Sequence, residues 1–461
     1  MEKKQNARLW VSVLYFAQGL PYTVVNLMSV IFLKGMGTSN ELIGLTSLLS
    51  FPWVLKGLWG PVVDLYSTKR KWILTTEIIC AFLFAFLAFG VLTPAPIIIS
   101  LVIFTAIAFV SATHDIAIDG FYLNTLNKDQ QALFVGVRNT AYRGAVIAGS
   151  GVLVFLAGKL AEQHLVTGNT GDTKIYQDIP LSLFGSDFSV SALNYGWATA
   201  FGICAIMFVL IYLFQRWYLP YPRNYDLESG APQQTTSFSE AFKTYFQQDK
   251  IGWIVTYVLI FRLGDALTFK MAPPFLMDKV EKGGLAVSTS DMGLLSGTLG
   301  VMFLLIGGLL GGYLIAKQGL KKWMWPTAIL QNSTNVLYWL LAINQPGIEW
   351  AYAVNSIEQF TYGLGVAAYT VFLMRTVRPE YEASHYAITT AFMAAGVLIP
   401  GVFSGYLQAN LGYQNYFLMS ALAVVPGMLT IFFLPLEDEK KLASMPRPGL
   451  DDFDLYQGRS L

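Results

Sequence analysis

Charged residues are scarce in this chain. Asp, Glu, Lys and Arg make up 13% of its 461 residues, whereas soluble globular domains carry about 25%. Apolar residues reach 54%, and counted at about 20 residues per helical span they fill most of the length. The composition excludes an ordinary soluble domain and predicts a polytopic membrane protein.

The residues that common active sites require are also few. The three histidines, His114, His164 and His385, lie far apart, so a zinc site or a Ser-His-Asp arrangement has little to build on. The two cysteines lie in apolar segments, which indicates neither a disulfide framework nor a metal site. A Walker phosphate loop is missing, and with a net charge of +1 the basic residues are scattered. We therefore expect no enzyme, cofactor, metal or nucleic-acid partner.

Hydropathy, read against Gly, Pro and charge breaks, predicts twelve spans. They lie near residues 9–33, 40–65, 72–93, 97–124, 133–160, 193–217, 251–277, 287–316, 323–344, 349–376, 382–409 and 412–435. An even number of spans places both termini on one side of the membrane.

The distribution of basic residues predicts which side this is. Twenty Lys and Arg fall on the side of the N-terminus and five on the opposite side. By the positive-inside rule, both termini are expected in the cytoplasm. The expected organisation is an N-terminal six-helix bundle (1–217), a cytoplasmic linker (218–250), a C-terminal six-helix bundle (251–436) and a cytoplasmic tail (437–461).

The two halves of the chain repeat one another. Gly57 and Gly60, followed by Lys71-Trp72, recur at a constant offset of 251 as Gly308 and Gly311, followed by Lys322-Trp323. Two six-helix halves related in parallel and joined by a long loop are typical of the major facilitator fold. The predicted fold class is therefore an all-α polytopic membrane protein with twelve transmembrane helices in two six-helix halves.

A candidate gate lies between the second and third spans. The run from Gly60 to Asp64, followed by Lys69, Arg70 and Lys71, resembles the major facilitator signature. In it, an acid at a helix end could pair with basic residues and hold one conformation. Alternatively, the basic residues only set the topology and the glycine only permits close helix packing. The second copy has Ile315 in place of the acid. The candidate gating residues are Gly60, Asp64, Lys69, Arg70 and Lys71.

Several ionisable residues lie inside the predicted spans. Each costs roughly 2.5 to 3.5 kcal/mol on insertion scales, so each is expected to face a cavity or a partner. Glu77 is nearer a helix end, where we expect its side chain to reach the interface. The remaining set is Lys56, Asp115, Asp119, Arg138, Arg143, Arg262, Asp265, Lys270 and Glu358.

The spacing of the acids and bases in spans 4 and 5 predicts two pairs. If the loop near 125–132 closes an antiparallel hairpin, Asp119 lies level with Arg138 and Asp115 with Arg143. The pair of Arg138 and Asp119 either fixes helix packing or belongs to the transport path. Asp115 is expected to respond to protons, and Arg143 to bind an anion through its planar fork of donors. In span 7, Arg262 and Asp265 either pair on one helical face or contact substrate together with Lys270.

Energy coupling is expected to come from an ion gradient, with protons the first choice because membrane carboxylates are present. The candidate proton-coupling residues are Asp115, Asp119, Asp265 and Glu358. Pro21 and Pro273-Pro274 interrupt spans 1 and 7, which are related by the repeat, and such interruptions indicate a binding site. Among many aromatic residues that only pack, Tyr22 and Tyr142 are candidate substrate contacts.

These motifs, taken in order, resemble the AmpG muropeptide permease family. The likeness covers most spans, but not residues 162–192, 218–250 or the tail after about 436. It is carried by Gly19-Leu20-Pro21, the run from Lys56 to Asp64, Asp115-Ile-Ala-Ile-Asp119, Tyr142-Arg143-Gly144, Arg262-Leu-Gly-Asp265, Gln331, Asn335, Glu358 and Ala387.

The resemblance implies import of cell-wall turnover products, N-acetylglucosaminyl-anhydro-N-acetylmuramic acid with or without peptide, across a bacterial inner membrane with the proton gradient. Such products feed wall recycling and can signal β-lactamase induction. A monomer in the bilayer is expected. The expected substrate-binding residues are Lys56, Arg143, Arg262, Lys270, Tyr22, Tyr142, Gln331 and Asn335.

The chain departs from the family pattern at three positions. His114 stands where an amide is expected, Arg262 where a lysine is common, and Lys270 has no counterpart. Two alternatives stay open. One is a transporter of another anionic solute, such as an acyl-coenzyme A, because the same branch is similar to acetyl-coenzyme A transporters. The other is a membrane sensor that binds wall fragments without moving them.

Overall fold

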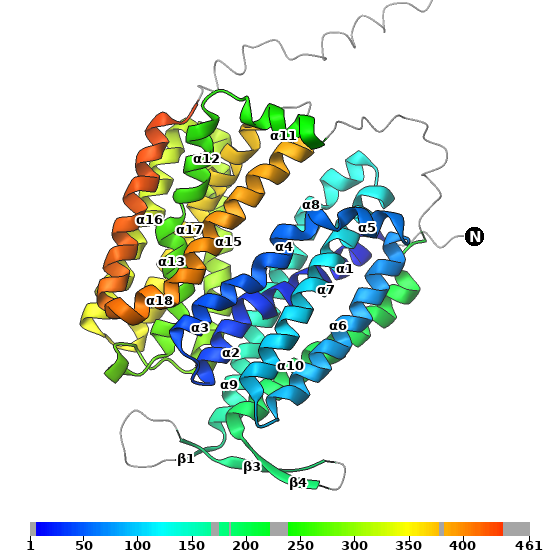
Figure 1. Cartoon of the computed structure of the whole chain (residues 1–461), viewed down its shortest axis with the longest axis vertical. Coiled ribbons are helices and arrows are strands. Elements are labelled where there is room, and N and C mark those ends of the chain that lie inside the picture. Colours follow the sequence, from blue (N-terminus) through cyan, green and yellow to red (C-terminus); the bar gives the residue numbers. More distant parts are fainter. Residues whose placement is uncertain (1–5, 167–174, 184–185, 222–237, 378–381, 437–461) are drawn as a thin grey trace, which may run out of the picture.

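The computed structural model describes residues 6–166, 175–183, 186–221, 238–377 and 382–436, and most of them are helical. The predicted tail and most of the predicted linker lie outside these residues. Figure 1 shows two helical bundles side by side, with the colour running from blue to green through the first half of the chain and from green to red through the second.

The N-terminal half contains six helical passages, several of which are interrupted. They are α1 (Ala7–Thr23), η1 (Val24–Met28) and α2 (Ser29–Gly35); α3 (Asn40–Leu45), η2 (Thr46–Ser50), α4 (Phe51–Leu55), η3 (Lys56–Leu58) and α5 (Gly60–Leu65); α6 (Lys69–Val91); α7 (Pro96–Thr125); α8 (Lys128–Val146), η4 (Ile147–Leu153) and α9 (Val154–Glu162); and α10 (Ala192–Tyr218).

The C-terminal half begins after a short helix in the linker, α11 (Phe238–Phe246). Its passages are α12 (Ile251–Ile260) and α13 (Leu263–Met277), followed by η5 (Val280–Lys282); α14 (Thr289–Met292), η6 (Gly293–Leu299) and α15 (Gly300–Gln318); α16 (Leu320–Asn344); α17 (Ile348–Arg375); and α18 (Glu382–Thr430), followed by η8 (Ile431–Phe433).

The helices agree with the predicted spans. Among the described residues, eight helices are long and apolar enough to cross a membrane by length and composition. One of them is α18, in which Gly412 has φ 70° and ψ 166° and so divides two helices. Adding α16, α17 and the interrupted 40–65 passage gives the twelve predicted spans. The repeat is also visible, because α6 begins at Lys69 and α16 at Leu320, 251 residues later.

The polar stretch after α9 forms two β-hairpins within the described residues. β1 (Leu165–Val166) pairs antiparallel with β2 (Ile175–Tyr176), and β3 (Asp178–Leu183) pairs antiparallel with β4 (Ser186–Ser191). They lie at the end of the molecule opposite α11 (Figure 1). We call these the hairpin end and the linker end.

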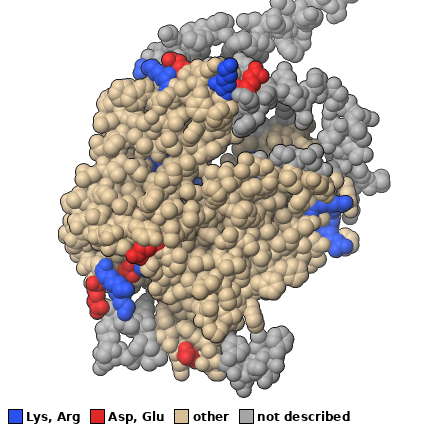
Figure 2. Space-filling view, in the orientation of Figure 1, with Lys and Arg blue, Asp and Glu red and all other residues tan. Residues whose placement is uncertain are grey.

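The outer surface is suited to lipid. Large apolar side chains on the outer helices are strongly exposed, among them Phe82, Phe86, Ile98, Val102, Leu309 and Leu422. An apolar surface of this size is a liability in water but is required in hydrocarbon. On the face shown in Figure 2, the charged side chains gather mainly at the two ends, and the band between them is largely uncharged.

The two halves share one hydrophobic core at the hairpin end. Residues of the first half, such as Met28 and Leu153, belong to the same buried cluster as Met271, Phe275 and Leu295 of the second. The linker end is different, because there each half has a core of its own, around Trp10 and Phe121 in one and Tyr257 and Phe372 in the other. The bundles therefore meet at the hairpin end and diverge toward the linker end (Figure 1).

Small residues allow the close contact at the hairpin end. The π-helical segments η4 and η6 pack against each other. A Cβ added to Gly297 would lie 2.0 Å from the carbonyl oxygen of Ser150, and one added to Gly405 of α18 would lie 1.9 Å from that of Asn40. Such backbone approaches are typical of helix packing in membranes.

Glycines of α15 provide a test of the same kind of close backbone packing within the second half. A Cβ at Gly307 would lie 2.0 Å from the carbonyl oxygen of Phe360, whereas a Cβ at Gly312 meets nothing within 4 Å. We expect Gly307→Ala to lower stability by about 1 to 3 kcal/mol through overpacking. Gly312→Ala, the matched control, should be neutral or stabilising by about 0.5 to 1 kcal/mol. Thermal unfolding of the purified variants in detergent measures both, and equal effects would contradict the packing argument.

Candidate transport site

Asp115 of α7 is the best-connected buried acid in the first half. Its side chain accepts hydrogen bonds from Lys56 Nζ and from Gln18 Nε2, and the residue is 8% exposed. Lys56 lies at the η3 break of the second passage, and Gln18 on the buried face of α1. Three helical passages therefore meet at one ion pair.

Asp119 lies one turn further along α7 and makes the predicted pair. Its Oδ1 is 3.2 Å from Arg138 Nη2 and accepts a hydrogen bond of 3.1 Å from the hydroxyl of Tyr15. The guanidinium of Arg138 lies over the Tyr15 ring, 4.5 Å from its centroid. Both charged side chains are about one third exposed, so solvent weakens this pair relative to that of Asp115.

The predicted pairing of Asp115 with Arg143 is wrong. Lys56 of the neighbouring passage reaches Asp115 instead. Within the described residues Arg143 has no carboxylate at ion-pair distance. It lies within electrostatic reach of three tyrosines, Tyr22, Tyr142 and Tyr362, the last of them from the second half.

Arg262 and Asp265 of the seventh passage also do not pair in the described structure, contrary to one of the two predictions for them. Arg262 lies at the break between α12 and α13, with φ −95° and ψ 10°, so the regular helical spacing of three residues is lost there. Its Nη2 donates instead to the hydroxyl of Tyr362. Asp265 accepts from two amides of α16, from Gln331 Nε2 and, at 2.9 Å, from Asn335 Nδ2.

Gln331 and Asn335 bind Asp265 in this structure, and their substrate contact stays a prediction. Both are 2% exposed, and they lie four residues apart on one face of α16, where their amides hold the Asp265 carboxylate. Glu358 of α17 is partly buried and accepts a hydrogen bond of 2.7 Å from its neighbour Gln359. Lys270 reaches across to the first half, where its Nζ donates to Thr46 Oγ1 at 2.9 Å.

Tyrosines from both halves lie between these charges. The Tyr22 ring is 5.1 Å from that of Trp53 and 6.4 Å from that of Tyr142, measured between centroids. Tyr22 also lies within electrostatic reach of Tyr362 and Arg262. The structure thus brings Tyr22, Tyr142, Arg143 and Arg262 into one region between the halves, with Asp115 close to Tyr22 and Tyr142.

The candidate gating residues lie at the linker end of the first half. Arg70 donates to the carbonyl oxygens of Arg216 (2.6 Å) and Leu219 (3.3 Å) and so caps α10. The stem of Lys69 packs beside Gly120 of α7. Lys71 is exposed, and Gly60 begins α5 with open space beside its Cα. The side chain of Asp64 lies outside the part of the structure that is described, so the predicted acid–base latch stays a prediction.

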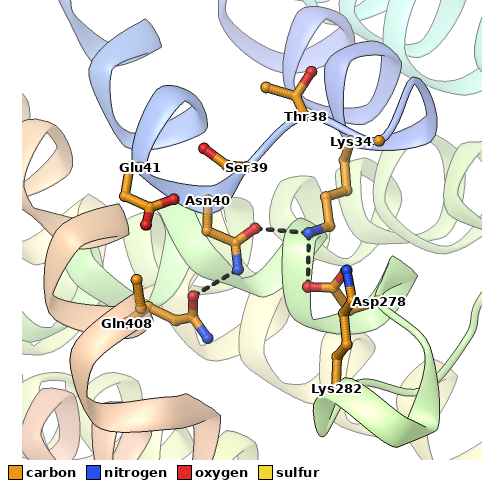
Figure 3. Close-up of a pocket in the computed structure, with 10 residues that line it drawn as sticks. Lys34, Thr38, Ser39, Asn40, Glu41, Asp278, Lys282 and Gln408 are labelled. Atoms are coloured by element: carbon orange, nitrogen blue, oxygen red, sulfur yellow. Dashed lines mark hydrogen bonds and ion pairs between the residues drawn. The ribbon is translucent and has the colours of Figure 1, made fainter.

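A polar network closes the hairpin end between the halves (Figure 3). Lys34 Nζ of α2 lies 2.6 Å from Asp278 Oδ2 and 2.7 Å from Asn40 Oδ1. Asn40 in turn donates to Gln408 Oε1 at 2.6 Å and to the Tyr413 hydroxyl at 2.8 Å. The side chains of Lys34 and Asp278 are 9% and 11% exposed. A cavity of about 320 Å³ lies beside them.

A second polar contact crosses between the halves at the same end. Ser290 of α14 donates its hydroxyl proton to Glu162 at the end of α9. Glu162 is also bound by Lys159 at 2.8 Å. Both contacts join side chains that hydropathy alone assigns to loops or helix ends.

Sequence reasoning missed several of these side chains. They are Lys34, Gln18, Asp278 and Tyr413, and the departure from an apolar pattern at Gln18 is the one available signal. The interpretation of Glu77 is wrong, because its side chain does not reach the interface but is wholly buried.

Comparisons with known proteins agree with this architecture. The anhydromuropeptide permease of Escherichia coli K12 is 24% identical over 91% of this chain and 78% of its own length. A putative transporter named AmpG 4 from Rickettsia felis is 22% identical over 92% of this chain and 95% of its own. A family model described as acetyl-coenzyme A transporter 1 matches residues 8–96.

A solved structure is similar along nearly the whole chain. It is an inward-facing, unoccupied bacterial homologue of the human lysosomal transporter Spinster, with a TM-score of 0.68 at 16% identity, covering 92% of this chain and 95% of that one. The likeness confirms the predicted fold. The relatives confirm the predicted resemblance and the assignment to transporters and not to enzymes.

Proposed function

We propose that this chain, an AmpG-like transporter with the major facilitator fold, imports anhydromuropeptides together with protons across a bacterial inner membrane by alternating access. The relatives support a membrane-embedded secondary transporter of a small molecule. The cargo, the coupling ion and the identity of the membrane are what we propose beyond this.

The proposed cargo is supported by a pair of arginines that lie between the halves. Arg143 and Arg262 come from opposite halves, and within the described residues neither has a carboxylate at ion-pair distance. A partly buried arginine without a counter-charge is costly, so an anionic ligand would be bound strongly there. Tyr22, Tyr142 and Tyr362 surround them, and aromatic rings suit sugar faces. An anionic sugar, such as a lactyl-bearing or peptide-bearing muropeptide, matches both features.

The Lys56–Asp115 ion pair supports proton coupling. An ionised Asp115 holds Lys56 and the Gln18 amide, and these contacts tie the second passage and α1 to α7. When Asp115 takes up a proton, the ion pair is lost and the three helical passages are released from one another. Asp119, Asp265 and Glu358 remain further candidates, of which Asp265 is held by two amide donors.

Alternating access is supported by the asymmetry between the two ends. The halves share a core and polar contacts at the hairpin end, whereas their cores are separate at the linker end. This arrangement fits a state open toward the linker. The positive-inside rule places that side, with both termini, in the cytoplasm, so the state is inward-facing.

An acyl-coenzyme A is the second candidate cargo. It is favoured by the acetyl-coenzyme A transporter family model, which matches residues 8–96. Its phosphates would also suit Arg143, Arg262 and Lys270.

Uptake into proteoliposomes tests the proposal. The purified chain is reconstituted, and labelled anhydromuropeptide or acetyl-coenzyme A is supplied with and without an imposed pH gradient. We expect accumulation of the muropeptide that depends on the gradient. Uptake of acetyl-coenzyme A alone would favour the second candidate. Binding of the muropeptide without uptake would identify a sensor. Equal uptake with and without the pH gradient would rule out proton coupling.

Replacing the acid of the ion pair tests its role in coupling. We expect Asp115→Asn to abolish accumulation driven by the pH gradient, because the amide cannot take up a proton, while exchange of labelled for unlabelled muropeptide continues. Glu281→Gln removes an exposed acid in η5 and is the control. If Asp115→Asn accumulates substrate as the unchanged protein does, Asp115 is a structural residue.

Replacing the unpaired arginine tests the anion site. We expect Arg143→Ala to weaken binding of the anionic muropeptide about tenfold to a hundredfold, the loss of a hydrogen bond to a charged group of about 1.5 to 3 kcal/mol. Binding of a neutral disaccharide should change little. Arg216→Ala, at an exposed site on α10, is the control. Equal losses for the anionic and neutral ligands would point to damaged helix packing.

We expect the polar network at the hairpin end to stabilise the inward-facing state. Lys34→Met leaves Asp278 buried without its partner, and breaking such a pair costs about 3 to 5 kcal/mol. The inward-facing state should lose population at least tenfold relative to the outward-facing one. Spin labels at the exposed Gln163 and Lys282 should then report longer distances between the halves.

Lys317→Met is the control, because the exposed Lys317 at the linker end of α15 contacts Tyr313 of its own helix. Unchanged distances in Lys34→Met, or an equal change in Lys317→Met, would contradict a latch made by Lys34 and Asp278.

A further inference from the structure

A second group of buried polar side chains lies on α6, α7 and α10. It contains Glu77 of α6, Ser111 and His114 of α7, and Gln215 of α10. Glu77, His114 and Gln215 are 0% exposed and Ser111 is 1% exposed. His114 Nε2 lies 3.7 Å from Glu77 Oε1, which is close enough for an ion pair but too far for a hydrogen bond.

Helices α6 and α10 bring Glu77 and Gln215 to one level. α6 and α10 run antiparallel, because Asn194 bonds to Val91 at one end and Arg70 to Arg216 at the other. Between these contacts, the rings of Phe84 and Phe208 lie 5.4 Å apart. Seven residues along each helix from this ring pair, two turns in the same direction, come Glu77 and Gln215. Two turns return a side chain to the same helical face, so both residues face the contact between α6 and α10.

Every polar atom at the centre of this group lacks a hydrogen-bond partner within the described residues. The atoms are both carboxylate oxygens of Glu77, both ring nitrogens of His114, both amide atoms of Gln215 and the hydroxyl of Ser111. Buried polar groups in native proteins are nearly always satisfied by protein or by ordered water, so each of these needs an explanation. The group offers donors and acceptors on three sides, which is what a buried water requires.

We propose that Glu77, His114, Ser111 and Gln215 form a hydrated proton-binding site, in which the carboxylate and the imidazole share one added proton. The added proton exchanges between a Glu77 oxygen and a His114 nitrogen, so both groups respond to pH, and the positive charge gained cancels the charge of the carboxylate. Waters bound by Ser111 and Gln215 complete the hydrogen bonds. Trp72 Nε1, a further buried donor without a partner five residues nearer the linker end of α6, extends the polar path toward that end.

The surroundings make this pair the group that titrates. Cys80, one turn from Glu77 on α6, is the other titratable side chain on that buried face. Arg216 of α10 is exposed, and Asp115 and Asp119 are paired with Lys56 and Arg138 of other helical passages. Because His114 and Asp115 are neighbours on one helix, a change of charge in this site acts on the helix that carries the proposed coupling acid.

Nuclear magnetic resonance of the ring nitrogens in the full chain, labelled at histidine and held in lipid nanodiscs, tests the site without any substrate. His114→Asn identifies the His114 signals, and His164, in the hairpin-end segment, is the internal control. We expect the His114 signals to move between about pH 5 and about pH 8, the range in which histidine titrates. In Glu77→Gln they should stay at their neutral positions, because the buried imidazolium loses its counter-charge.

Two results would overturn the proposal: His114 signals that do not move with pH in the unchanged protein, or signals that move equally in Glu77→Gln. Should Glu77→Gln fail to fold, infrared spectra of the carboxyl band in the unchanged protein and in His114→Asn replace it. The band should titrate in the first and shift its titration in the second, and identical titrations would count against a shared proton. None of these readings depends on transport, so a failed muropeptide uptake experiment leaves this test intact.

Discussion

The need to neutralise charge in a medium of low dielectric determines how this protein is arranged. A charged side chain in hydrocarbon is stable only beside a partner, and the partner usually comes from another helix. Lys56 with Asp115, Arg138 with Asp119, and Lys34 with Asp278 each join separate helical passages. The same requirement makes Arg143 and Arg262 informative, because they come from opposite halves and have no such partner in the described residues.

The two halves pack closely at the hairpin end and are separate at the linker end, and the charged side chains of the candidate site lie between them. Glycine and serine at the contact of η4 with η6 let the backbones approach, and the Lys34 network covers the same end. The aromatic and basic side chains of the candidate site lie between the halves, where a movement of one half against the other changes their distances. A site between the halves can be exposed to each side of the membrane in turn while its residues keep their places in the two bundles.

Helix α7 connects two polar regions that differ in kind. Asp115 faces α1 and the second passage and is fully engaged with Gln18 and Lys56. His114 faces α6 beside Glu77, where polar atoms are left without partners. A departure from the family pattern at position 114, visible in the sequence, thus coincides with a buried group that the family resemblance does not explain.

The sequence by itself determined the membrane class, the twelve spans, the two repeated halves and the family resemblance, because hydropathy and repeats are properties of order along the chain. It also predicted the pair of Asp119 and Arg138, since both lie near one tight helical connection. Only the tertiary structure decided that Lys56 reaches Asp115, that Gln331 and Asn335 hold Asp265, and that Glu77 is buried. Depth in the membrane follows from position in the sequence, but the direction in which a side chain faces depends on helix breaks such as that at Arg262 and on the neighbours packed around each helix.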